Sequence, residues 1–273
     1  MVPSPPRITL VTPSLNQAQF LEDTIRSVVF QHYPNLEYFV LDGGSTDGSI
    51  DIIRKYEQQL TYWRSCRDGG QAAAINEGFE RATGEILGWV NSDDMLIPNS
   101  LFAVARAFAK YPRTEMIVGK SIIIDEDNKV TRPVCGLRPT YHSVLFWSTG
   151  AFTQPATFWR RSVMEQVGPL RPEFRLAFDC EFYLRLLRIG RSKWINDYLA
   201  AFRIHPDSIT STLKAERDRE AMEFRYRLYG LGSWPAAFRS CAWMYYQARC
   251  RFFSGLFKLA VLTGLERVPI IES

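Results

Sequence analysis

Short apolar runs alternate with amphipathic stretches along the first part of the chain. The apolar runs are rich in β-branched and aromatic residues, which predicts strands at 7–12, 36–41, 60–65, 85–91 and 116–124. Between the first two runs, Leu21, Ile25 and Val28 recur at helical spacing, and similar patterns follow the later runs. Strands that alternate with helices through short turns indicate an α/β fold, with a mostly parallel sheet covered by helices on both faces.

The pattern changes after residue 212. Residues 214–230 have the pattern of a strongly charged helix, and residues 234–262 are aromatic, apolar and basic with no single charged face. We therefore expect one domain at 1–213 and a C-terminal helical extension at 214–273. Two interpretations of 234–262 stand with equal weight: a helical pair that packs on the domain, and an interfacial segment that touches a membrane. Both leave room for contact with a partner chain or a second copy of this one.

The composition says more about the compartment of the protein than about the reaction it carries out. The 33 basic and 29 acidic residues give a net charge of +4, which suits an anionic substrate or a membrane surface and does not call for nucleic acid. The five cysteines are odd in number and scattered without metal spacing, as is typical of a reducing compartment. The N-terminus lacks the apolar core of a signal peptide, and no apolar run reaches about eighteen residues. We expect a cytoplasmic protein, with the extension at the inner face of the membrane as one alternative.

Polar loops follow the first four predicted strands. In chain order they read PSLNQ, DGGSTDGS, CRDGGQ and NSDD. The carboxyl ends of parallel strands open on one edge of a sheet, where ligands of such folds bind. In the second loop, the glycines and Asp47 suit a tight turn and a helix cap, while Asp42 is placed to accept hydrogen bonds from a base or ribose. The convergence of the four loops predicts a ligand site at this edge.

Asp93 and Asp94 stand side by side where the fourth predicted strand ends. Two carboxylates about 4 Å apart near a surface repel by on the order of 4 kcal/mol. Taken alone, the pair is more readily explained as a helix start, since Pro98 suits an early helical position. Together with the other loops, it points to a ligand site, in which solvent, a cation or a basic partner would offset the repulsion.

The stretch ITLVTPSLNQAQFLEDTIRSVVFQHYPNLEYFVLDGGSTDGSIDII resembles the opening of a glycosyltransferase family 2 enzyme. The later stretch DGGQAAAINEGFERATGEILGWVNSDDML resembles the segment that leads to the DxD motif of that family, and the resemblance extends over about residues 6–212. It implies a GT-A fold with a Rossmann-like sheet, a nucleotide-sugar donor (most often UDP-linked) and Mn²⁺ or Mg²⁺. It also implies inverting transfer to a hydroxyl of a saccharide or lipid-linked saccharide, in surface polysaccharide or glycolipid synthesis.

The resemblance also assigns roles to individual residues. It implies donor contacts for Pro13, Ser14, Asn16, Asp42, Arg67, Asp68, Gln71, Asn76, Asn91 and Ser92. It implies cation contacts for Asp93, with Asp94 beside it, and for His205 in the loop AFRIHPDSITS. The chain departs from the family where Asn91 replaces the first aspartate of DxD, and a neutral amide is a weaker partner for ribose or cation.

A second group of candidates lies on the acceptor side. The stretch FRLAFDCEFYLRLLRIG predicts an amphipathic helix that begins near Asp179, and the family carries its general base at this place. From the residues alone, Asp179 is equally well explained as a charge at a helix N-terminus. Gln154, Trp159 and Glu181 are the candidates for contact with the acceptor.

Three other functions compete with a glycosyltransferase. A nucleotidyltransferase of similar fold would need a basic loop after the first strand, and PSLNQ contains neither lysine nor arginine. The second is a catalytically silent nucleotide-sugar-binding or scaffold protein. Asn91 favours this alternative, whereas the presence of Asp93, Asp179 and His205 together argues against it. A processive synthase is disfavoured because no QxxRW motif occurs.

Overall fold

The computed structural model describes residues 4–134, 138–147, 152–262 and 268–269. The first half contains β1 (Ile8–Ser14), α1 (Ala18–Val29), β2 (Leu36–Asp42), α2 (Ser49–Lys55), β3 (Tyr62–Ser65), α3 (Gln71–Arg81), β4 (Ile86–Trp89), β5 (Met95–Leu96), α4 (Ser100–Lys110) and β6 (Met116–Ile124). The second half contains β7 (Val130–Val134), α5 (Tyr141–Trp147), β8 (Thr157–Arg160), α6 (Arg161–Val167), α7 (Phe178–Ile189), β9 (Ser192–Arg203), α8 (Ile209–Thr212), α9 (Lys214–Leu228) and α10 (Ala236–Leu262).

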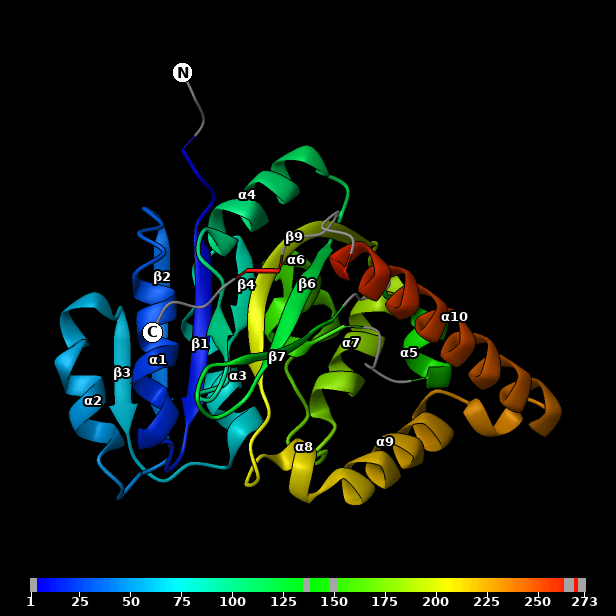
Figure 1. Cartoon of the computed structure of the whole chain (residues 1–273). Coiled ribbons are helices and arrows are strands. Elements are labelled where there is room, and N and C mark those ends of the chain that lie inside the picture. Colours follow the sequence, from blue (N-terminus) through cyan, green and yellow to red (C-terminus); the bar gives the residue numbers. More distant parts are fainter. Residues whose placement is uncertain (1–3, 135–137, 148–151, 263–267, 270–273) are drawn as a thin grey trace.

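The strands form one curled sheet through the centre of the molecule (Figure 1). Its order is β3-β2-β1-β4-β8-β6-β9-β5, with β7 paired to the side of β6. The strands β3, β2, β1 and β4 run parallel, and β8 then joins β4 to β6 in antiparallel pairs. The predicted α/β fold with a mostly parallel sheet is confirmed.

Both faces of the parallel part are covered. Along β1, Leu10 packs into the apolar cluster that includes Leu21 and Ile25 of α1, while the next residue, Val11, packs into the cluster that includes Ile75 of α3. This alternation follows from the two-residue period of a strand, and it explains why β1 is apolar along most of its length. A Cβ on Gly78 of α3 would come within 2.5 Å of the Val11 side chain, so glycine lets α3 lie close to the sheet.

An aromatic cluster holds the second half of the chain against the first. The ring of Trp89 on β4 stacks on Tyr183 of α7, with centroids 5.9 Å apart, and meets Trp159 of β8 edge-on at 5.4 Å. Phe182 of α7 lies 5.2 Å from Trp159. Such pairs are worth about 0.5–1.5 kcal/mol each beyond their buried area. The cluster therefore fixes the start of α7 relative to the end of β4.

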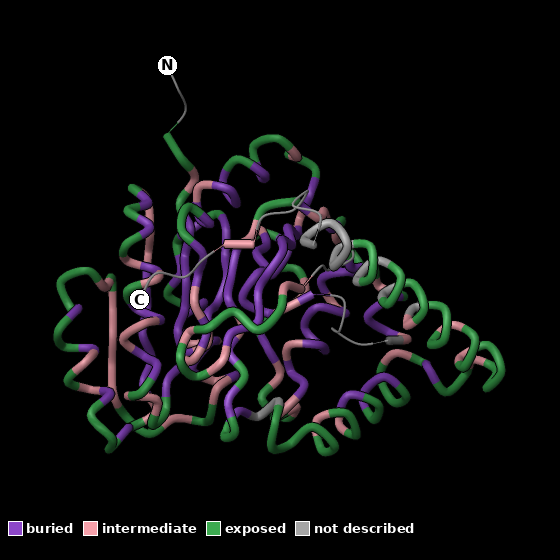
Figure 2. The backbone as a smooth tube through the Cα atoms, in the orientation of Figure 1, coloured by how far each residue is buried: buried purple, intermediate pink, exposed green. Residues whose placement is uncertain are grey.

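The extension consists of α9 and α10. Phe224 of α9 is buried in the same core as Trp89. By contrast, most of the residues of α10 whose burial the structure describes are exposed (Figure 2). Residues 236–262 form one continuous helix rather than a pair, and its first turns pack on α5, where Phe146 meets Phe238 at 5.8 Å. Among the described residues, no helix combines the length and the apolar character that crossing a membrane requires.

Candidate active site

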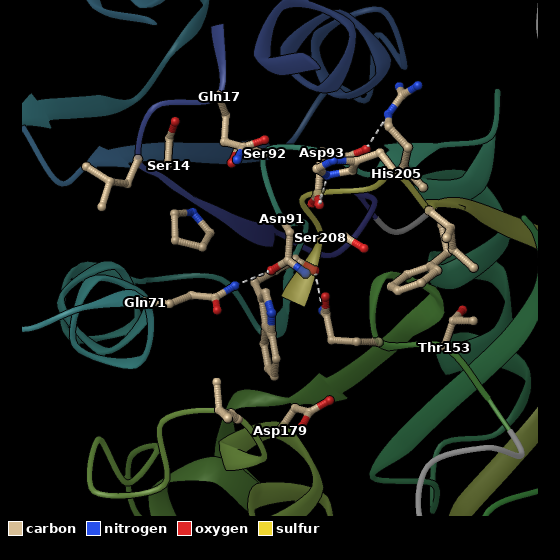
Figure 3. Close-up of a pocket in the computed structure, with 18 of the residues that line it drawn as sticks. Ser14, Gln17, Gln71, Asn91, Ser92, Asp93, Thr153, Asp179, His205 and Ser208 are labelled. Atoms are coloured by element: carbon tan, nitrogen blue, oxygen red, sulfur yellow. Dashed lines mark hydrogen bonds and ion pairs between the residues drawn. The ribbon is translucent and has the colours of Figure 1, made fainter. Parts of the chain in front are cut away.

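A pocket of about 590 Å³ opens beyond the carboxyl ends of β1 and β4 (Figure 3). The loops after these strands, the start of α3, the start of α7 and the segment after β9 all contribute to its wall. Ten of the residues predicted from the sequence line it: Pro13, Ser14, Asp68, Gln71, Asn91, Ser92, Asp93, Gln154, Asp179 and His205. The edge of the sheet predicted to bind a ligand is therefore hollowed in the structure.

Asp93 and His205 meet on one side of this pocket (Figure 3). Asp93 Oδ2 lies 3.4 Å from His205 Nε2, although 112 residues separate them. The imidazole is 7% exposed, and its ring centroid lies 4.7 Å from that of Phe20. One carboxylate oxygen and one ring nitrogen are thus held together where both can reach a bound molecule.

The carboxylate oxygen suits both Mn²⁺ and Mg²⁺, whereas the imidazole nitrogen suits a transition metal such as Mn²⁺ better than Mg²⁺. No group of three or more His, Cys, Asp or Glu side chains with metal-binding geometry occurs within the described ranges. A cation held by Asp93 and His205 would therefore take its other ligands from water and from the molecule bound in the pocket.

Asp94 points the other way, and its expected role as a second cation ligand needs correction. It is 1% exposed, and its Oδ1 accepts a hydrogen bond from the backbone N–H of Arg203 at 3.0 Å. The Asn91 amide nitrogen lies 3.3 Å from its Oδ2. Burial, with the charge of Asp93 as a smaller cause, raises the pKa of Asp94 well above the usual value. The two adjacent carboxylates thus separate into one that faces the pocket and one that holds the loop to β9.

Arg203, which belongs to no motif of the sequence, completes this connection. Its side chain is fully buried, and its Nε donates to the Asp93 carbonyl oxygen at 2.8 Å. Its guanidinium also pairs with Asp23 of α1 at 3.7 Å. A buried cation is tolerated only with such partners. The arginine therefore brings the end of β9, and with it His205, next to Asp93. In the sequence, its importance was indicated only by its position as a charged residue directly after the apolar run YLAAF.

Asp179 lies across the pocket from Asp93 and His205, at the first turn of α7 (Figure 3). Its Oδ1 accepts a hydrogen bond from the backbone N–H of Cys180 at 2.7 Å. Burial raises the pKa of Asp179 above its usual value, although the Cys180 N–H and the charge of Arg217 act in the opposite direction. A carboxylate with a raised pKa is a better proton acceptor than a solvated one.

Two amide side chains lie between these sides. The amide nitrogen of Gln71 donates to Asn91 Oδ1 at 2.9 Å, which orients both groups. Gln154 donates to the carbonyl oxygen of Trp89 at 2.7 Å. Gln17 and Thr153 also line the pocket, and no signal in the sequence marked them out.

Four predicted donor contacts do not line the pocket, and three of them make local contacts instead. Asp42 is 0% exposed, and its carboxylate accepts hydrogen bonds from the backbone of Gly44 and from Ser65. Asn76 exchanges two hydrogen bonds of 2.8 Å with the backbone of Leu170. The other two are Asn16, whose Oδ1 accepts from the Thr46 N–H at 3.0 Å, and the exposed Arg67. In the described structure, Asp42 and Asn76 hold loops in place.

Two predicted acceptor contacts also need correction. Trp159 is 0% exposed, because it forms the centre of the aromatic cluster behind the pocket. Glu181 is equally buried and pairs with Arg185 at 2.9 Å and Arg171 at 3.2 Å. It also accepts a hydrogen bond from Tyr229 at 2.7 Å. Neither side chain has a surface that an acceptor could touch.

The parallel-then-mixed sheet, the pocket at its strand ends and the aspartate after β4 define a GT-A glycosyltransferase. The model of the family described as "Glycosyl transferase family 2" matches residues 9–171, and the chain belongs to this family. It is accordingly an enzyme of the glycosyltransferase class, as the resemblance in the sequence implied.

Individual proteins agree with this assignment. The chain is 26% identical over 215 residues to a putative teichuronic acid biosynthesis glycosyltransferase of Bacillus subtilis, covering 76% of this chain and 82% of that protein. Residues 1–349 of Staphylococcus aureus TarS in complex with UDP match with a TM-score of 0.64 and 18% identity, over 89% of this chain and 71% of that one. A longer TarS chain is covered to 44%. The mannosyltransferase PcManGT from Pyrobaculum calidifontis, in complex with GDP-Man and Mn²⁺, matches with a TM-score of 0.61 and 18% identity, over 97% and 77%.

Proposed function

We propose that this pocket transfers a sugar from a nucleotide-diphosphate donor, in the first place a UDP-sugar, to an acceptor hydroxyl with inversion at the anomeric carbon. One observation carries the proposal: the Asp93–His205 pair and Asp179 face each other across a single pocket (Figure 3). Inverting transfer needs this arrangement, because the leaving diphosphate and the attacking hydroxyl stand on opposite faces of the sugar ring.

On the donor side, Asp93 and His205 would hold a divalent cation together with the diphosphate oxygens. When bound, Mn²⁺ or Mg²⁺ supplies Lewis acidity toward the departing diphosphate. Pro13 and Ser14 of β1 and Asp68 before α3 line the region that the nucleotide would fill. The Arg203 contacts keep the Asp93 loop in position throughout, so that little reorganisation accompanies the reaction.

On the acceptor side, Asp179 would accept the proton of the acceptor hydroxyl as its oxygen attacks the anomeric carbon. The bond to the diphosphate oxygen breaks as the new glycosidic bond forms, so no covalent sugar–enzyme intermediate is needed. General base catalysis of this kind contributes about 10²–10⁴-fold. The raised pKa of Asp179 favours this role, because the carboxylate holds the transferred proton more firmly than a solvated aspartate does.

Similar proteins support the choice of donor and pathway. TarS was solved with UDP, PcManGT with GDP-Man and Mn²⁺, and the Bacillus relative carries a name that places it in teichuronic acid biosynthesis. We therefore place the reaction in the synthesis of a surface polysaccharide or glycolipid, with a saccharide or lipid-linked saccharide as acceptor.

A donor panel tests the proposal. With nucleotide sugars offered singly, we expect nucleotide release from at least one, highest among the UDP-sugars. Removal of divalent cations by EDTA should lower this release at least about tenfold, and Mn²⁺ or Mg²⁺ should restore it. Nucleotide binding without release from any donor would contradict the proposal and favour a catalytically silent sugar-nucleotide-binding protein.

We further propose that α10 contacts the cytoplasmic face of a membrane. Trp243 and Met244 are 48% and 53% exposed on this helix, and no aspartate or glutamate occurs between Glu223 and Glu266. Four basic residues lie on α10 itself: Arg239, Arg249, Arg251 and Lys258. Exposed aromatic side chains favour the bilayer interface, and cations favour anionic headgroups.

Vesicle co-sedimentation tests this contact. Replacing Trp243 and Met244 together by glutamine should weaken binding to vesicles that contain anionic phospholipid by about tenfold, because two apolar side chains no longer enter the interface. Phe30→Gln is the matched control, since Phe30 is an aromatic residue, 56% exposed, at the end of a different helix. Equal binding of the double variant and the unmodified protein would exclude α10 as the membrane contact.

A further inference from the structure

Three arginines that the mechanism above does not use line the pocket. They are Arg132 of β7, Arg175 before α7 and Arg217 of α9. Within the described parts of the chain, the side chains of Arg132 and Arg175 make no hydrogen bond or ion pair, and Arg217 pairs only with its exposed neighbour Asp218, at 3.0 Å. An exposed pair of this kind contributes little, so Arg217 remains available to a ligand.

Other arginines around the pocket are fully engaged in the fold. Arg185 donates to Glu181 and to three backbone carbonyl oxygens, and Arg171 pairs with the same Glu181. Arg203 is engaged by Asp93 and Asp23. Folding therefore explains these three cations, whereas it leaves Arg175 and Arg217 without a buried partner at the wall of a cavity.

Hydrogen bonds to the backbone join the segment of Arg175 to the helix of Arg217, just before Asp179 in the chain. Glu220 of α9 accepts hydrogen bonds from the backbone N–H groups of Arg175, Leu176 and Ala177, at 2.9, 2.7 and 2.7 Å. Arg217 lies three residues before Glu220 in α9, on the same side of the helix. The segment that carries Arg175 into the start of α7 is thus clamped to the helix that carries Arg217. The positive charge of Arg217 is near enough to Asp179 to act on its carboxylate.

We infer that the acceptor carries an anionic oxygen group, a phosphate or a carboxylate, near its reacting hydroxyl, and that Arg175 and Arg217 bind this group, with Arg132 lining the same pocket. The inference rests on the proposed function, since it assigns the Asp179 side to the acceptor. Guanidinium groups match both anions with paired hydrogen bonds. Without them, an anionic acceptor would be repelled by Asp179, and a neutral acceptor would need no unpaired arginines.

Small anions test this assignment on the full-length protein. UDP and Mg²⁺ are added first, so that the donor side is filled, and methyl phosphate, methyl glucuronide or neutral methyl glucoside is then titrated and followed by protein NMR. We expect at least one anion to bind and the glucoside to bind at least tenfold more weakly. Arg175→Gln combined with Arg217→Gln should weaken anion binding at least tenfold and leave the affinity for UDP within about twofold.

Arg227→Gln is the matched control, because Arg227 lies on the same helix and pairs with Glu223 outside the pocket. It should change neither the affinity for the anion nor the affinity for UDP. If the double variant does not fold, Arg175→Gln and Arg217→Gln are tested singly. Binding of methyl phosphate alone identifies a phosphorylated acceptor, and binding of methyl glucuronide alone identifies a uronic acid.

Two results would overturn the inference. One is equal affinity for the anions in the double variant and the unmodified protein. The other is a tenfold loss of UDP affinity in the double variant, which would assign both arginines to the donor. Neither result would affect nucleotide release from the donor panel, so the proposed function would survive. Absence of nucleotide release would instead contradict the proposed function, and the anion titration would then report only whether the arginines bind an anion.

Discussion

Asp179→Asn should lower the rate of sugar transfer by at least about a hundredfold, the lower bound for loss of a general base. The substitution keeps the size and the hydrogen bond from Cys180 and removes the basicity. The affinity for the nucleotide sugar should stay within about twofold, because Asp179 lies across the pocket from Asp93 and His205 (Figure 3). Steady-state transfer rates and isothermal titration with the nucleotide measure the two effects separately.

The pH dependence gives an independent readout of the same residue. A general base works in its charged form, so activity should rise with pH through the pKa of Asp179. Because burial raises that pKa, the acid limb of kcat/KM should lie at a higher pH than the usual aspartate value of about 3.9. The limb should disappear in Asp179→Asn. An unchanged acid limb in this variant would place the base elsewhere.

Glu181→Gln is the matched control, since it makes the same carboxylate-to-amide change two residues along α7. The carboxylate of Glu181 is buried between Arg185 and Arg171, so its loss leaves buried positive charge uncompensated. Breaking such a pair costs about 3–5 kcal/mol of unfolding free energy. The variant should therefore unfold at lower denaturant concentration and yet transfer sugar at a normal rate while folded. Normal transfer by Asp179→Asn together with an inactive Glu181→Gln would reverse the two roles.

Asp93→Ala should reduce cation-dependent turnover of the donor by about a thousandfold. The variant removes one of the two protein ligands proposed for the cation, and the Lewis-acid contribution to charge stabilisation amounts to several kcal/mol. At 1.36 kcal/mol per tenfold, about 4 kcal/mol corresponds to that loss. Titration with UDP in the presence and absence of Mn²⁺ should show that the metal no longer increases affinity.

Asp94→Asn is the control that distinguishes the proposed cation ligand, Asp93, from the adjacent carboxylate. The amide that replaces the carboxylate would retain an oxygen to accept the Arg203 N–H, and Asp94 does not line the pocket. We therefore expect this variant to keep most of the metal-dependent affinity for UDP. If Asp93→Ala binds UDP and Mn²⁺ as tightly as the unmodified protein while folded, the cation is held by other groups and the assignment of Asp93 fails.

Much of the fold follows from local patterns. The strands at the start of the chain were predictable because buried parallel strands appear as short apolar runs, and β1, β2 and β4 lie within two residues of the predicted bounds. The place of the pocket was predictable for a related reason, since parallel strands put the loops after them on one edge. The antiparallel insertion of β8 between β4 and β6 was not, because pairing between distant strands leaves no signature in the runs themselves.

The pattern of apolar and polar residues did not predict the direction in which individual side chains point. Asp93 and Asp94 are identical in type and adjacent, yet one faces the pocket and the other accepts a hydrogen bond from β9. Asp42 satisfied every local criterion for a ligand contact, but hydrogen bonds from its own loop and from Ser65 of β3 occupy its oxygens. Trp159 was expected at the acceptor, and the aromatic cluster buries it instead.

By itself, the sequence determined the alternation of strands and helices, the edge of the sheet that carries the site, and the family to which the chain belongs, because these depend on periodicity and on motifs that are continuous in the chain. Only the tertiary structure decided which candidates meet. It joined Asp93 to His205 across 112 residues through the buried Arg203, and it brought Arg217 of the C-terminal extension to the pocket. The reason is physical: such contacts depend on long-range packing and on the pairing of buried charges, and neither is encoded in the spacing of residues along the chain.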